Sequence, residues 1–171
     1  MKIGWQGLAL LALLTTLTGA CGGLWPAKAP SAAEMNRRLG RGVNLGNALE
    51  APREGEWGVI LRAEYFDLIQ QAGFDAVRIP VRWSAHAARE APYTIAPEFL
   101  ARVDWAVQQA LSRDLLVVVN MHHYEELFTD PDGERERFVA LWEQIATHFR
   151  EYPPELLFEL LNEPHDSLTA R

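Results

Sequence analysis

The sequence has one cysteine and two lysines among its 171 residues. A lone Cys21 excludes an internal disulfide and a cysteine-rich zinc site, so packing must stabilise the fold. Lys2 and Lys28 lie near the N-terminus, and the chain beyond them has no amine for a Schiff base, a phosphate-binding loop or a pyridoxal anchor. We therefore expect no cofactor.

Positive charge is also scarce. The 16 Lys and Arg residues stand against 23 Asp and Glu residues, which gives a net charge of -7. The chain therefore has no basic surface for nucleic acid. Its 49% hydrophobic and 23% charged residues are typical of one folded domain and exclude disorder as a description of the whole chain.

The N-terminus has the pattern of an export signal. Lys2 precedes the apolar run Leu8 to Leu17, which is too short to span a membrane, and we expect a signal peptide over residues 1–20. Cys21 follows Gly19 and Ala20, as in bacterial lipoproteins, where this cysteine carries the lipid; Thr18 stands where that pattern usually has leucine. Lipid anchoring of Cys21 to a membrane and ordinary secretion both remain open, and both predict an extracellular or cell-envelope protein.

Residues 21–38 are rich in Ala and Pro and are interpreted as a tether to a domain at 39–171. Within that domain, apolar strands alternate with amphipathic helices. Strands are predicted at 41–48, 76–83, 115–121 and 156–161, and helices at 61–72, 97–111 and 138–149. Continuous apolar strands have both faces buried, so the pattern predicts an α/β fold with a parallel sheet covered by helices.

Polar residues gather where the predicted strands end. They are Asn44 and Asn47, Trp83, His122 and His123, and Asn162 and Glu163, in strand order. Loops after the strands converge at the mouth of a (β/α)8 (TIM) barrel, so this placement favours a barrel over an open sheet. A complete barrel needs about 250 residues, and four strands predict an incomplete (β/α)8 barrel, truncated after its first half.

The chemistry centres on Asn162 and Glu163. A carboxyl at the mouth of an apolar strand is partly enclosed, and burial raises a carboxyl pKa toward the range of a general acid. Glycoside hydrolysis needs such an acid at the leaving oxygen, and a neighbouring amide can hold the sugar 2-hydroxyl. The alternative is that Asn162-Glu163-Pro164 only ends a strand, with Glu163 solvated.

Four motifs carry a family resemblance. GVNLGNALEAP, AGFDAVRIPVRW, VVVNMHHYEEL and ELLNEPH follow one another along the four predicted strands. In this order and spacing they resemble glycoside hydrolase family 5, the cellulase or endo-β-1,4-glucanase family, from about Arg41 to Arg171. The resemblance implies a TIM barrel that hydrolyses β-1,4-linked glucans, and in some members mannans, with retention of anomeric configuration.

The resemblance also assigns roles to the matching positions. Glu163 is the acid/base and Asn162 the partner of the sugar 2-hydroxyl. The remaining matches are Arg78 and His122, which frame the active site, and Asn47, Glu50 and His123, which contact sugars around it. The implied partner is a β-linked polysaccharide or oligosaccharide.

Three side-chain questions stay open at this point. Strand alternation places Arg78 on one face of its strand, where Glu159 is a candidate counterion, and a buried structural pair is compatible with a catalytic role. His122 and His123 are consecutive and point to opposite faces, so we expect no metal site. Trp57 and Trp83 are each a sugar platform or a packing residue, and neither is assigned.

A retaining enzyme needs a second carboxylate about 5 Å from the acid. In the resembling family this nucleophile lies on the seventh strand, beyond Arg171, and Glu159 lies too deep in its strand to replace it. We therefore expect the chain alone to be inactive. A glucanase is the favoured function, and a non-catalytic glycan-binding relic is the alternative. Mannan and β-1,3-glucan remain open as substrates.

Overall fold

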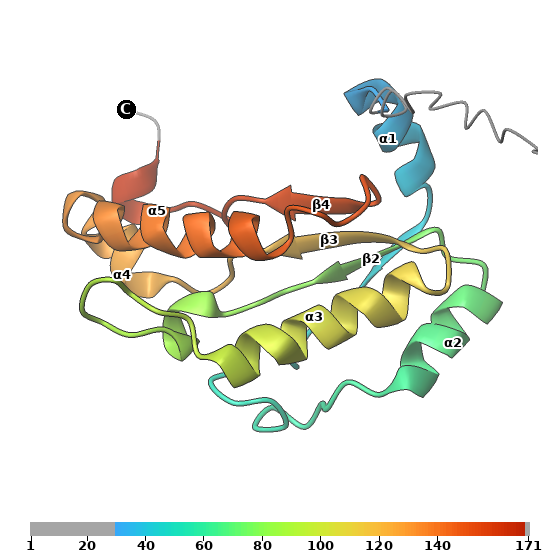
Figure 1. Cartoon of the computed structure of the whole chain (residues 1–171), viewed down its shortest axis with the longest axis horizontal. Helices are drawn as coiled ribbons and strands as arrows, with labels where there is room; N and C mark the ends of the chain where they lie inside the picture. The colour runs from blue at the N-terminus through green and yellow to red at the C-terminus, as the bar shows by residue number, and fades with distance from the viewer. Residues whose placement is uncertain (1–29, 170–171) are drawn as a thin grey trace, which may run out of the picture.

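The computed structural model describes residues 30–169, which contain one sheet of four parallel strands in chain order (Figure 1). The strands are β1 (Gly42–Asn44), β2 (Ala76–Ile79), β3 (Leu116–Asn120) and β4 (Leu156–Glu159). Val43 pairs with Val77, Val77 with Val117, and Val117 with Leu156, so one register runs across the sheet. The prediction of a parallel α/β sheet is confirmed.

Helices alternate with the strands, as a barrel requires, and the first helix precedes β1. They are α1 (Ala32–Leu39), α2 (Ala63–Gln71), α3 (Pro97–Leu111), α4 (Glu125–Thr129) and α5 (Pro131–His148), with 3₁₀ helices η1 (Trp83–His86) and η2 (Asp166–Leu168). Pro97 opens α3, and Gly73, at φ +76°, ends the turn after α2. None of the described helices is long and apolar enough to cross a bilayer.

One face of the sheet is the core. Val77, Ile79, Val117 and Val119 have no exposed surface and belong to one cluster with side chains of α2, α3 and α5. Burial of each such side chain stabilises the fold by about 1.5–3 kcal/mol. Figure 1 shows α3 and α5 lying along this covered side. The helices therefore hold the sheet rigid while the opposite face carries polar groups.

Helix α1 lies at the end of the sheet opposite α4 (Figure 1). Ser31 caps it by accepting a hydrogen bond from the Glu34 amide, at 3.2 Å, and Met35 packs on Ala76 and Leu116. This differs from the sequence interpretation, which extended the tether to residue 38; a capped helix whose one buried residue is Met35 docks there instead. The rest of the tether, the predicted signal peptide and Cys21 lie outside the described residues.

Candidate active site

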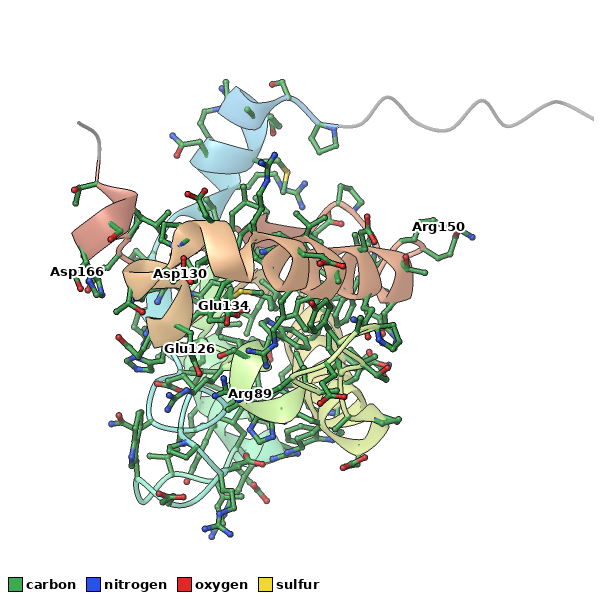
Figure 2. The ribbon with its side chains drawn as sticks, turned by 90° about the vertical axis from the view of Figure 1, so that its left-hand side faces the viewer. Arg89, Glu126, Asp130, Glu134, Arg150 and Asp166 are labelled. Atoms are coloured by element: carbon green, nitrogen blue, oxygen red, sulfur yellow. The ribbon has the colours of Figure 1, made fainter. Side chains whose placement is uncertain are left out.

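The predicted functional residues lie at the carboxyl end of the sheet, because all four strands run in the same direction. Figure 2 looks onto this end. There Arg89, in the loop after β2, donates to Glu126 of α4 at 2.5 Å (Figure 2). An ion pair therefore links the loop after β2 to the segment after β3 at the carboxyl end of the sheet.

Arg78 is the centre of the site. Its guanidinium donates to both oxygens of Glu159, each at 2.7 Å, and the same Nη2 donates to Asn162 Oδ1 at 2.8 Å. Nη1 donates to Asn44 Oδ1 at 3.1 Å. Bidentate pairing fixes the plane of the guanidinium, so Arg78 joins β1, β2 and β4 and holds the Asn162 amide in one orientation. The counterion expected for Arg78 is thus Glu159.

The charges of three carboxylates act on this guanidinium. The pKa of Arg78 is raised chiefly by its hydrogen bond to Glu159, with smaller contributions from the charges of Glu163 and Glu50. Glu163 follows Asn162 directly in the chain and is exposed, so the partly enclosed setting expected of this carboxyl is not present in the described residues. The structure therefore brings Glu163, Asn162 and Arg78 together at one end of the sheet.

The Glu159 carboxyl is a pH-sensitive part of the fold. Hydrogen bonds from Arg78 lower its pKa, against the opposing effect of partial burial. A lowered pKa in the folded state means that the pair stabilises the protein above the unfolded pKa of about 4.3, and that this stability is lost as the pH falls through the folded value.

We expect Glu159→Gln to make the midpoint of thermal unfolding less dependent on pH below about pH 5, because the variant has no carboxylate to protonate there. Thermal unfolding followed by circular dichroism from pH 7 to pH 3 measures this. Glu151→Gln is the matched control, since the Glu151 side chain is 83% exposed. Parallel curves for wild type and Glu159→Gln would contradict the role given to the pair.

His122 lies beside the same cluster through Asn120. The Asn120 amide nitrogen is 3.0 Å from His122 Nδ1 and 3.4 Å from Glu159 Oε1. Burial lowers the pKa of His122, and the charges of His123 and Arg78 lower it further. The ring is therefore neutral at neutral pH. Asn120 is the polar residue in the otherwise apolar strand β3, and this was the only signal in the sequence for a role that the motifs did not assign.

Backbone strain marks three of the predicted site residues. Asn47, His123 and Glu163 have positive φ angles of 64°, 50° and 41°. Non-glycine residues in this region cost free energy and cluster at functional sites. Each of the three follows a different strand, so the strain is concentrated at the carboxyl end of the sheet.

Glu50 occupies a different kind of position from the sugar contact expected of it. It is 4% exposed, and its carboxylate accepts hydrogen bonds from the backbone amides of Asn47 and, at 3.0 Å, Ala48. The two backbone amides supply hydrogen bonds to the buried carboxylate, and these bonds fix the conformation of the turn that contains the amides. Glu50 thus holds the turn after β1, and Asn47 in that turn is exposed to solvent.

The two unassigned tryptophans differ in exposure. Trp83 is fully buried, and its Nε1 donates to the Asn120 carbonyl at 3.0 Å, so it is a packing residue. Trp57 is 42% exposed and meets His123 edge to face, with ring centroids 5.7 Å apart. His123 also meets His122 edge to face at 4.5 Å, so the prediction that the two side chains point to opposite faces is wrong, because both residues lie beyond the end of β3 at Asn120. An aromatic surface therefore borders the polar cluster.

Other features of the described residues lie apart from this cluster. A hollow of about 900 Å³ lies between the loop at 91–97 and helix α5, and none of the seven predicted site residues lines it. Between residues 30 and 169 no group of three or more His, Cys, Asp or Glu side chains is placed to hold a metal ion. The polar mouth of the sheet is thus the candidate site.

Comparison with known proteins gives consistent matches. The model of the family described as cellulase (glycosyl hydrolase family 5) matches residues 40–170. Endoglucanase H of Acetivibrio thermocellus is 46% identical over 147 residues, which are 84% of this chain and 16% of that protein. Endoglucanase A of Ruminococcus albus is 38% identical over 146 residues, which are 78% and 40% of the two chains.

Solved structures agree with these matches. Endoglucanase Cel5A of the hyperthermophilic Thermotoga maritima superposes with a TM-score of 0.78 at 57% identity, covering 80% of this chain and 44% of that one. That protein has been solved in complex with mannotriose and with cellobiose. The chain therefore spans less than half the length of each of these proteins, and its four strands superpose on part of a larger fold.

Proposed function

Since this chain belongs to glycosyl hydrolase family 5, we propose that it supplies the acid/base half of the active site of a retaining barrel enzyme that cleaves β-1,4-linked glucans. The observation that carries the proposal is the Arg78 cluster, which orients Asn162 directly beside Glu163 at the carboxyl end of the sheet. The names of the relatives and of the superposed structures support the same chemistry.

The bonds of Asn162 specify what its amide does. Its Oδ1 accepts from Arg78, so its Nδ2 is the atom that donates to a substrate. In the proposed reaction Nδ2 donates to the sugar 2-hydroxyl oxygen, a bond that strengthens as the oxocarbenium-like transition state forms. Glu163 protonates the leaving glycosidic oxygen and then takes a proton from the attacking water.

The second carboxylate of a retaining mechanism is proposed to come from the part of the enzyme that corresponds to the seventh strand of the family. Glu159 is unsuited to this role, because both its oxygens are engaged by Arg78. Asn47 and His123 are proposed to contact sugars at the rim, and Glu50 to act through the turn that holds Asn47. A polymer substrate fits the proposed location outside the cytoplasm, whether or not Cys21 is lipidated.

The proposal is tested with an intact enzyme that carries this chain. We expect it to hydrolyse carboxymethylcellulose and cello-oligosaccharides, and proton NMR of the first product to show the β-anomer before mutarotation. Parallel assays on mannan and β-1,3-glucan rank the substrates by kcat/KM. The α-anomer as first product would contradict retention, and binding of glucan without hydrolysis would identify a glycan-binding relic instead.

A further inference from the structure

We propose that Asn120 is a positioning residue that fixes the tautomer of His122, so that the imidazole carries its proton on Nε2 and presents a hydrogen-bond donor to the substrate. The inference rests on the proposed function only for the acceptor, a sugar hydroxyl oxygen. The tautomer itself follows from contacts within the chain.

Asn120 has a defined reason to be ordered. It is the last residue of β3, follows three valines and has no exposed surface. A buried amide without partners costs free energy, so its hydrogen-bonding atoms must be satisfied inside the protein. Oδ1 lies 3.3 Å from the Val81 amide, and Nδ2 lies near His122 Nδ1 and Glu159 Oε1.

These partners determine which way the amide faces. The backbone N–H of Val81 can only donate, so the Asn120 atom opposite it must be the oxygen. The ionised Glu159 carboxylate can only accept, so the atom facing it must be the NH₂ group. Both partners demand the same orientation, and the Asn120 NH₂ group consequently also faces His122.

The orientation of the amide then determines the state of the imidazole. An NH₂ group donates, so His122 Nδ1, at 3.0 Å, must be the bare nitrogen that accepts. A neutral imidazole has one N–H, which therefore lies on Nε2. The pKa of His122 is lowered by burial, then by His123 and Arg78, while the acidic groups that face it, Glu50 and Glu159, raise it by less. The neutral ring is thus the dominant form at neutral pH.

This state has a functional consequence. Nε2 lies on the opposite side of the imidazole ring from Nδ1, which accepts from Asn120. Because Nε2 carries a hydrogen, it can donate to a hydroxyl oxygen but cannot accept a proton. His122 therefore binds and orients, and proton transfer is left to Glu163. Through Glu159 and Arg78, Asn120 also connects His122 to Asn162 in one hydrogen-bonded chain.

The test is a spectroscopic measurement on an intact enzyme that carries this chain, labelled with ¹⁵N in histidine. Long-range ¹H–¹⁵N correlation spectra distinguish a protonated from a bare ring nitrogen, and His122→Gln assigns the His122 signals. We expect wild-type His122 to show Nε2–H and a bare Nδ1. Asn120→Asp has nearly the same shape but offers an acceptor, so we expect the proton to move to Nδ1 and the titration midpoint of His122 to rise.

Gln144→Glu is the matched control. It makes the same amide-to-carboxyl change at a residue that accepts from the Ile95 amide and donates to the Tyr93 carbonyl. It should leave the His122 signals unchanged. In kinetics we expect Asn120→Asp to lower kcat/KM by about tenfold, the equivalent of one hydrogen bond, and to move the acidic limb of the pH profile with the His122 titration.

A wild-type Nδ1–H signal, or an Asn120→Asp variant with unchanged His122 tautomer and titration, would overturn the proposal. The spectra need no hydrolysis, so failure of the proposed function leaves this measurement intact. An active enzyme with the other tautomer would instead contradict the role of Asn120 alone.

Discussion

Replacing Glu163 with glutamine is expected to lower kcat on polymeric β-1,4-glucan by about 10²–10⁴-fold in an enzyme that carries this chain. Glutamine keeps the size of the side chain and the contacts of its neighbours but cannot protonate the leaving oxygen. The size of the loss depends on the leaving group. A sugar hydroxyl needs the proton to leave, whereas a nitrophenolate leaves without it. The first step, in which the aryl group leaves, should therefore proceed at nearly the wild-type rate on an aryl cellobioside.

Steady-state kinetics on carboxymethylcellulose and on a nitrophenyl cellobioside measure this difference, with azide added as an external nucleophile that needs no general base. Glu143→Gln, on the exposed surface of α5, is the control and should keep wild-type rates on both substrates. Equal losses on the polymer and the aryl substrate, without recovery in azide, would show that Glu163 is not the acid/base.

Replacing Arg137 with alanine is expected to reduce the free energy of unfolding by about 3 kcal/mol, because the buried carbonyl of Ser84 and two partly buried carbonyls lose their partner at once. Arg137 is 3% exposed and lies on α5. Its Nη2 donates to the Ser84 carbonyl at 2.7 Å and to the Ala87 carbonyl at 3.3 Å, and its Nε donates to the Ala88 carbonyl at 3.3 Å.

The same guanidinium lies 5.5 Å from the ring of Tyr124, whose hydroxyl donates to Glu134 at 2.6 Å. Arg137 therefore joins α5 to the loop after β2 and to the residue that follows His123. Loss of this contact should loosen two sides of the mouth, so activity should fall at temperatures well below unfolding. Both effects originate in one buried side chain remote from the chemistry.

Urea unfolding of wild type, Arg137→Ala and Arg135→Ala gives the comparison. Arg135 lies two residues earlier on the same helix and is exposed, so its removal should change stability by less than about 0.5 kcal/mol. If the two variants were equally stable, the contacts of Arg137 would have to be replaced by water at little cost, and the role proposed for it would be wrong.

Short-range patterns in the sequence were sufficient to predict most of the strands and helices. Unbroken valines predict β3, Pro97 and Gly73 predict the ends of helices, and the alternation of apolar strands with amphipathic helices predicts a parallel sheet. These signals are local because chain stiffness, glycine freedom and hydrophobic periodicity act over a few residues. The differences are α1, which packs Met35 against the sheet, the unpredicted helix α4, the start of α5 at Pro131 rather than at residue 138, and the end of β2 at Ile79 rather than at residue 83.

The location of the site was also predictable, since parallel strands place their carboxyl ends at one edge whatever their exact register. The order of the motifs therefore placed Arg78, His122, Asn162 and Glu163 at one mouth. Spacing along the chain says nothing, however, about which side chain bonds to which across that mouth. Arg78 lies 81 residues from Glu159 and 84 from Asn162, yet touches both.

The amino-acid sequence was thus enough to establish the family, the alternating architecture and the edge of the sheet where the chemistry lies. Only the folded chain shows that Glu50 is turned inward onto the backbone of its own loop, that Trp83 is buried, and that Asn120 links His122 to Glu159. The reason is physical. Helix and strand signals depend on neighbours in the chain, whereas burial and hydrogen-bond partners depend on strand register and side-chain packing between segments far apart in sequence.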